Sequence, residues 1–147
     1  MTLVGEYVPS KAQWVRDQVE KFEATDGQEA STLRDSGYPI VVITSVGAKS
    51  GALRKNPVMR VERDGEYVAI ASKGGADDQP EWYYNFVTHP EVDLQDGAVK
   101  KTYRVELVEG EERADLWELS VSTWPTYAEY QKKTDREIPV FKLTPID

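Results

Sequence analysis

The sequence predicts a mainly β (α+β) fold, a small barrel of six antiparallel strands with peripheral helices and an N-terminal helix. Two observations support this prediction. Short apolar or alternating runs recur between turn signals, and the pairs Asp64-Gly65 and Asp96-Gly97 have the chemistry of tight hairpin turns. Because hairpins join antiparallel neighbours, a chain rich in them closes most simply into an antiparallel sheet or barrel.

Six segments are expected as strands. Residues 40–44 form a continuous apolar run, which is typical of a strand covered on both faces. The other five strands are expected at residues 58–62, 66–71, 91–95, 99–108 and 138–145. Within the fifth strand, alternation should place Tyr103, Val105 and Leu107 on one face.

Four segments are expected as helices. In residues 10–25, an apolar stripe recurs at helical spacing, and Ser10 and Gln13 have the spacing of a capping box. A second helix should begin at Pro80 and end before His89-Pro90. Residues 109–122 and 126–133 complete the set, the last with a capping-box spacing at Thr126. The stripe of the first helix consists of Ala12, Val15, Val19 and Phe22.

Length and composition limit the function. The 147 residues suit an N-terminal helical arm and linker, residues 1–34, followed by one barrel domain, residues 35–147. A net charge of -8 and a pI of about 4.8 argue against general nucleic-acid binding. The chain has no cysteine, no apolar run long enough to span a membrane, and no signal-peptide pattern at its start. We therefore expect a cytoplasmic protein, with peripheral contact to the inner membrane face left open.

One segment of this acidic chain is basic. No acidic residue occurs in the 26 positions between Asp35 and Glu62, so the lysines and arginines there have no nearby negative charge along the chain. A flexible basic loop with Gly47 and Gly51 would hold a phosphate or carboxylate. The alternative is an ordinary hairpin beside a buried strand. Neither a P-loop nor a GxGxxG motif is present. The basic residues are Lys49, Arg54, Lys55 and Arg60.

A second anion-binding feature is expected at residues 71–76. Gly74 and Gly75 can adopt positive φ and present their amides, Lys73 adds charge, and the helix expected from Pro80 adds a positive partial charge at its start. An ordinary turn is the alternative.

Aromatic residues cluster in two places. Residues 80–86 hold Trp82, Tyr83, Tyr84 and Phe86, which cannot all face a core. Tyr127 and Tyr130 should share one helix face close to Trp124. The two clusters can serve as core packing or as walls for a planar ring. His89 is expected to be structural, and no metal-ligand spacing and no obvious nucleophile are present, so a bound cofactor would carry the chemistry.

Three motifs resemble one known family. The stretches "TSVGAKSGALRKNPVM", "AIASKGGADDQPEWYYN" and "WPTYAEYQKKTDREIPV" are similar to the deazaflavin (F-420)-dependent nitroreductase family of actinobacteria. The resemblance implies a split β-barrel related to the FMN-binding, pyridoxamine-oxidase-like barrels. It also implies that reduced coenzyme F-420, an 8-hydroxy-5-deazaflavin with a phosphate and a poly-glutamate tail, passes a hydride to a quinone, nitro or activated-alkene acceptor.

The same resemblance implies roles for particular residues. Lys49, Ser50, Arg54 and Lys55 would hold the phosphate and tail, and Tyr127, Tyr130 and Ser72 would act in catalysis near the acceptor. The remaining residues implied for the cofactor are Ala48, Asn56, Pro57, Val58, Met59, Ile70, Ala71, Ser72, Lys73, Trp82, Tyr83 and Asn85.

Two positions depart from the family member that activates nitroimidazoles. Met59 and Trp124 stand where that member has tyrosines, so a quinone-like or enone acceptor is expected. Two other functions stay open from the sequence: an FMN-dependent oxidoreductase on the same barrel, and a non-catalytic F-420-binding protein. The chain could act as a monomer or as a homodimer.

Overall fold

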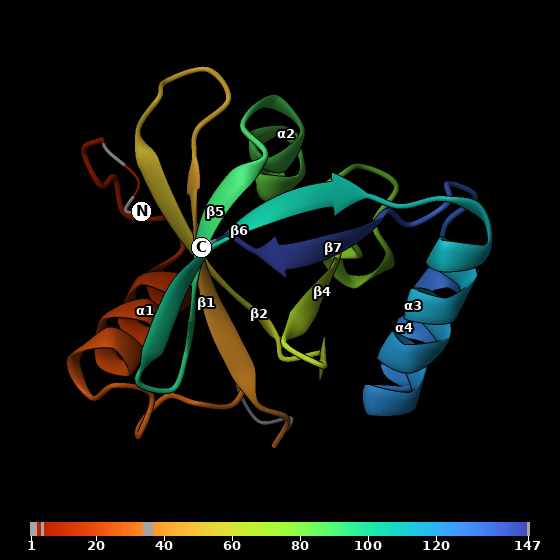
Figure 1. Cartoon of the computed structure of the whole chain (residues 1–147), viewed down its shortest axis with the longest axis horizontal. Helices are drawn as coiled ribbons and strands as arrows, with labels where there is room; N and C mark the ends of the chain where they lie inside the picture. Colours follow the sequence, from red (N-terminus) through yellow and green to blue (C-terminus); the bar gives the residue numbers. More distant parts are fainter. Residues whose placement is uncertain (1–2, 4, 34–36, 147) are drawn as a thin grey trace.

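The protein folds around one curved antiparallel sheet (Figure 1). The computed structural model describes residue 3, residues 5–33 and residues 37–146. Seven strands lie in the order β2-β1-β5-β6-β7-β4-β3 and form a half-open barrel. The strands are β1 (Ile40–Val46), β2 (Leu53–Met59), β3 (Glu62–Arg63), β4 (Glu66–Ile70), β5 (Glu91–Asp96), β6 (Val99–Leu107) and β7 (Val140–Pro145).

Helices contribute to the apolar cores on both faces of the sheet. They are α1 (Gln13–Ala24), the 3-10 turn η1 (Lys73–Gly75), α2 (Glu81–Thr88), α3 (Gly110–Thr123) and α4 (Thr126–Lys132). In Figure 1, α1 lies beside β1 and β2, whereas α3 and α4 lie together at the far end near β7. None of the helices in the described part of the chain is both long and apolar enough to cross a bilayer.

The prediction of a mainly β antiparallel split barrel is confirmed, with seven strands instead of six. The segment expected as one strand, residues 58–62, is divided between β2 and β3 at Arg60 and Val61. The boundary expected between arm and barrel, at residues 34 and 35, lies outside the described residues.

Strand β1 contributes to apolar cores on both faces of the sheet. Ile40 and Val42 belong to the core shared with α1, α3 and α4, whereas Val41 and Ile43 belong to the core inside the barrel with Phe141. All four β1 residues are at most 2% exposed. The continuous apolar run therefore has the two-sided cover that the sequence predicted.

Helix α1 buries the expected stripe. Val15, Val19 and Phe22 are buried against the sheet, and Ala12 packs beside them. The capping box at Ser10 is wrong, because the helix begins at Gln13 and the Ser10 hydroxyl instead accepts a hydrogen bond from the amide of Ala12 at 3.2 Å. Serine hydroxyls satisfy nearby amides in turns as readily as at helix caps.

The capping box expected at Thr126 is also wrong. Pro125 occupies the cap position of α4, and no side chain caps the helix. In β6, Tyr103 and Val105 are buried, and Leu107 is 42% exposed. The strand ends at Leu107, and the next buried position is Val108.

Both predicted hairpins are present. Asp64 and Gly65 have φ of 55° and 84°, the left-handed pair that a two-residue turn between β3 and β4 requires. The turn between β5 and β6 contains Gly97 at φ 63°.

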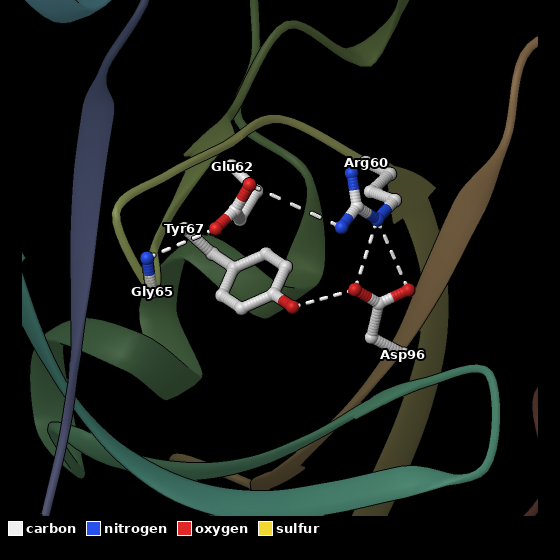
Figure 2. Close-up of polar contacts among 5 residues, drawn as sticks. All are labelled: Arg60, Glu62, Gly65, Tyr67 and Asp96. Carbon is white, nitrogen blue, oxygen red and sulfur yellow. Dashed lines mark hydrogen bonds and ion pairs between the residues drawn. The ribbon is translucent and has the colours of Figure 1, made fainter.

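A polar cluster joins Arg60, together with Tyr67 of β4, to Asp96 at the end of β5 (Figure 2). Nε of Arg60 donates to both carboxylate oxygens of Asp96, at 3.0 and 2.9 Å, and the hydroxyl of Tyr67 donates to Asp96 at 2.5 Å. Burial, with the adjacent Asp96 carboxylate, raises the pKa of Tyr67. Arg60 is therefore used in the scaffold and does not join the other basic residues of its segment.

Candidate functional site

The candidate functional site is a cleft of about 870 Å³. Residues 47–50 and strand β2 form one wall. η1 and the start of α2 form the second, and α1 and α4 form the third. Its volume lies within the range usual for sites that bind a drug-sized organic molecule.

Most of the predicted site residues lie together in this cleft. Those that line it are Ala48, Lys49, Ser50, Arg54, Lys55, Asn56, Pro57, Val58, Met59, Ile70, Lys73, Trp82, Asn85, Tyr127 and Tyr130. Ala71, Ser72 and Tyr83 do not line it. Ala71 is fully buried in the barrel core, Ser72 is 8% exposed behind Lys73, and Tyr83 packs against Phe141.

The basic segment is not one flexible loop, as the sequence suggested. Arg54, Lys55 and Pro57 belong to β2, paired in register with β1, and only residues 47–52 form the turn. β2 is the edge strand of the sheet, so its half-exposed positions tolerate charges and proline. Arg54 and Lys55 therefore stand on a hydrogen-bonded strand, which fixes the positions of their backbone.

Asn85 joins the turn to helix α2. Its Oδ1 accepts a hydrogen bond from the amide of Ala48 at 2.9 Å, and its Nδ2 donates to the hydroxyl of Ser45 at 3.4 Å. The turn also closes on itself, since the Gly47 amide donates to the Ala52 carbonyl at 2.7 Å. Within the described ranges, the amides of Lys49 and Ser50 have no protein acceptor, so they are available to a ligand.

The cations of the cleft differ in their pairing. Lys55 Nζ lies 2.6 Å from Oε2 of Glu23 on α1, and Lys73 Nζ lies 2.7 Å from Oδ2 of Asp78. Lys49 and Arg54 have no ion pair with any residue that the structure describes. Two uncompensated positive charges therefore face the cleft of an acidic protein.

The second wall depends on an unusual loop conformation. Lys73, Gly74 and Gly75 have φ of 47°, 65° and 87°, three consecutive left-handed residues. A Cβ on Gly75 would lie 2.8 Å from the carbonyl oxygen of Tyr130, so only glycine lets α4 approach this closely. The approach places the tyrosines of α4 beside Lys73 and Gly74 in the cleft.

Tyr127 and Tyr130 of α4 line the cleft, and Trp124 packs against both of them. The ring centroid of Trp124 lies 5.2 Å from that of Tyr127 and 5.6 Å from that of Tyr130, both edge-on. Burial, with a smaller effect from Tyr130, raises the pKa of Tyr127, and burial raises that of Tyr130. Both phenols are therefore protonated at neutral pH and can donate a hydrogen bond.

The aromatic residues of α2 are divided between core and cleft. Phe86 is buried inside the barrel, and the Trp82 ring packs 4.8 Å from it, between centroids, while still lining the cleft. Tyr84 lines the cleft and is 52% exposed. The expectation that these aromatics could not all face the core is confirmed.

These features fit an anionic, flat cofactor. Lys49, Arg54 and the free amides of the turn suit a phosphate or carboxylate. Pro57, Val58 and Trp82 offer apolar surface for a planar ring, and the phenols of α4 lie in the same cleft. Across the described residues, no three metal-ligating side chains lie close enough together to hold an ion.

Sequence reasoning missed several residues of this site. Trp14, Val15 and Leu33 of the N-terminal region line the cleft, although their spacing indicated only an amphipathic helix and a linker. Arg136 lies behind the loop of residues 71–79 and donates to its backbone. No local signal could have found these contacts, because they join segments about 60 or more residues apart.

Comparison with known proteins agrees with this chemistry. The family model described as "F420H(2)-dependent quinone reductase" matches residues 14–145. A relative from Mycobacterium tuberculosis with the same description is 32% identical over 110 residues, which cover 72% of this chain and 73% of the relative.

Solved structures show the same relationship. One described as an F420-H2 dependent reductase is 50% identical with a TM-score of 0.68, covering 71% of this chain and 93% of its own. Another, described as a domain-swapped dimer, is 44% identical with a TM-score of 0.71. The match covers 91% of this chain and 99% of that structure's chain. A Listeria innocua protein described as a pyridoxamine 5'-phosphate oxidase, 14% identical with a TM-score of 0.51, shares the fold.

The family model spans nearly all of the described chain, from α1 to β7, and so includes every wall of the cleft. The chain therefore belongs to the F420H(2)-dependent quinone reductase family.

Proposed function

We propose that the protein reduces a quinone-like acceptor with a hydride from reduced F-420, and that the cleft holds both molecules. One observation carries this proposal: the uncompensated cations Lys49 and Arg54 and the neutral phenols Tyr127 and Tyr130 line a single cleft. Family membership supports the cofactor and the acceptor class.

The protein would contribute binding and orientation. Reduced F-420, when bound, supplies a two-electron hydride donor. Lys49, Arg54 and the turn amides would hold its phosphate and glutamate tail through charge-assisted hydrogen bonds. Val58 and Met59 would support one face of the ring, so that an acceptor can lie on the other face at a fixed distance.

Tyr127 and Tyr130 would orient the acceptor and donate a proton. A quinone that accepts a hydride gains negative charge on oxygen, which a neutral phenol can stabilise by hydrogen bonding and then protonate. Ser72 has no place on the cleft surface, so a direct contact between its hydroxyl and the acceptor would require the loop to move. Its role stays a prediction.

Acceptor choice would depend on Met59 and Trp124. Met59 lines the cleft with an apolar side chain, and Trp124 packs edge-on against both tyrosines. Neither offers the phenol that the resemblance implies at the equivalent positions of the nitroimidazole-activating family member. We therefore propose quinone-like or enone acceptors over nitroimidazoles.

A homodimer is the assembly we propose, because a solved relative with 44% identity is a domain-swapped dimer. Light scattering on the purified chain across a concentration series tests this directly. A mass that stays at one chain would contradict it. A cytoplasmic location, with or without contact to a membrane surface, stays a prediction.

The decisive assay follows the loss of reduced F-420 absorbance with a panel of quinones, enones and nitro compounds. Rapid loss with quinones and slow loss with nitroimidazoles is the expected result. Tight binding of FMN without any binding of F-420 would instead favour an FMN-dependent enzyme. Binding of F-420 with no turnover of any acceptor would favour a carrier protein.

A further inference from the structure

The guanidinium of Arg136 holds the loop of residues 71–79 from behind. Nε donates to the carbonyl oxygen of Ala76 at 2.9 Å, and Nη2 donates to those of Ala71 and Ser72 at 3.2 and 3.1 Å. Nη1 donates to Oε1 of Gln79 at 2.9 Å. Since three of the four acceptors are backbone carbonyls, Arg136 fixes the path of the main chain.

The orientation of these carbonyls sets the orientation of the amides that follow them. In a trans peptide the N–H points opposite to the C=O. Because the Ser72 carbonyl faces Arg136, the Lys73 amide faces away from it. Lys73 and Gly74 line the cleft and Arg136 does not. In the described part of the chain, neither of these two amides has a protein acceptor.

The Gly75 amide donates to the Ser72 carbonyl within the loop, but local interactions alone do not hold this conformation. Lys73 has φ of 47°, which costs a side-chain-bearing residue free energy, and it is followed by two left-handed glycines. Such a conformation persists only where surrounding contacts determine it. The Arg136 side chain supplies four of those contacts.

The backbone of Arg136 is in turn hydrogen-bonded to Gln131 of α4. Nε2 of Gln131 donates to the Arg136 carbonyl oxygen at 2.7 Å, and the Thr134 hydroxyl donates to Oδ1 of Asp77 at 2.8 Å. The tyrosines that line the cleft lie on the same helix as Gln131. Arg136 thus connects the loop that contains η1, in the second wall of the cleft, to helix α4 in the third wall.

We propose that Arg136 is a positioning residue for cofactor binding: by holding the Ser72 carbonyl, it turns the amide of Lys73 toward the cleft, where this amide donates to an oxygen of the anionic cofactor. This inference rests on the proposed use of F-420. It assigns to Arg136 an effect on affinity that is separate from its effect on folding.

The test compares Arg136→Lys with Arg113→Lys. Arg113 is a matched control, because it also donates to a backbone carbonyl of the neighbouring segment, Ile138 at 2.7 Å, but contacts nothing in residues 71–79. F-420 binding is measured by fluorescence titration, and backbone hydrogen exchange of residues 71–79 is measured without cofactor. We expect the Kd of Arg136→Lys to rise at least about tenfold, as for other residues that orient a ligand-binding group. Exchange in the loop should also become faster.

The controls separate the possible failures. Arg113→Lys should bind F-420 like the wild type, even if it lowers the melting temperature as much as Arg136→Lys does. Gln79→Met, which removes one of the four acceptors, keeps the test usable if Arg136→Lys does not fold, and should raise Kd by about threefold, the effect of one modest hydrogen bond. A wild-type Kd in every folded variant of Arg136 or Gln79 would overturn the inference. Failure of the wild type to bind F-420 would overturn the proposed function itself.

Discussion

The side-chain oxygen of Asn85 accepts a hydrogen bond from the backbone amide of Ala48 at 2.9 Å. This contact joins helix α2 to the turn that precedes the basic strand β2. Asn85 is buried, so it supports the turn from below and leaves the turn amides and Lys49 facing the cleft. The residue that the family resemblance implied for the cofactor groove therefore has a second use, which is to shape the anion site.

Replacing Asn85 should damage both stability and binding. Asn85→Ala leaves the Ala48 amide and the Ser45 hydroxyl without their partner, which should lower the free energy of unfolding by about 1–3 kcal/mol. Urea denaturation measures this, and F-420 titration should show weaker binding. The control is Gln95→Ala, a buried amide whose bond to the Gly97 carbonyl lies in the β5–β6 turn. Unchanged F-420 affinity in Asn85→Ala would contradict this account of the turn.

The pairing of Lys55 with Glu23 should reduce its use for anion binding. Glu23→Gln frees Lys55 and removes the negative charge beside it, so F-420 should bind about threefold more tightly. The free energy of unfolding should fall by less than about 1 kcal/mol. Glu20→Gln makes the same change of charge on α1 without this contact. Equal F-420 affinities for the two variants would show that the ion pair with Glu23 does not reduce anion binding by Lys55.

The two phenols of α4 should matter for turnover more than for cofactor binding. Tyr127→Phe/Tyr130→Phe should lower kcat/KM for a quinone on the order of a hundredfold, the usual contribution of a positioned proton donor. The Kd of F-420 should stay near the wild-type value. Tyr103→Phe is the control, since Tyr103 is buried in the barrel core outside the cleft. Full activity in the double variant would remove both tyrosines from the mechanism.

Tyr127 should make the protein sensitive to alkali. Burial raises its pKa in the folded state, so above pH of about 10 the unfolded chain loses this proton while the folded chain keeps it. Stability is therefore fully present below that pH and falls as pH rises, by about 1 kcal/mol per pH unit for this group. Urea denaturation from pH 8 to 11 checks the slope. Tyr127→Phe should reduce the slope by the contribution of this one group, whereas Tyr84→Phe, at an exposed tyrosine, should not. Equal slopes in the two variants would contradict the effect of burial.

The sequence was most informative where local chemistry decides structure. The apolar run of β1 and the Asp64-Gly65 turn depend on residues next to each other, and both were predicted correctly. Residues 53–57 of strand β2 were missed because an edge strand need not alternate, and its charges and Pro57 resemble those of a loop. The capping boxes failed because serine and threonine spacing alone does not determine which residue caps a helix.

The site was predictable in part for a similar reason. Lys49 and Arg54 could be identified because they lie in a segment without acidic residues, although their fixed positions on and beside a strand could not. The cleft also depends on contacts between distant segments, such as Arg136 with Ala71 and Lys55 with Glu23. Such pairings follow from the topology of the sheet and not from any short motif.

The most direct test of the central claim is the affinity of Lys49→Ala/Arg54→Ala for F-420, measured by fluorescence titration at low salt. Two charge-assisted contacts are lost, so Kd should rise on the order of a hundredfold or more. Its dependence on ionic strength should weaken as well. Lys101→Ala/Arg104→Ala removes the same charge from β6, outside the cleft, and should bind like the wild type. Wild-type affinity in Lys49→Ala/Arg54→Ala would contradict the assignment of this cleft to the anionic cofactor.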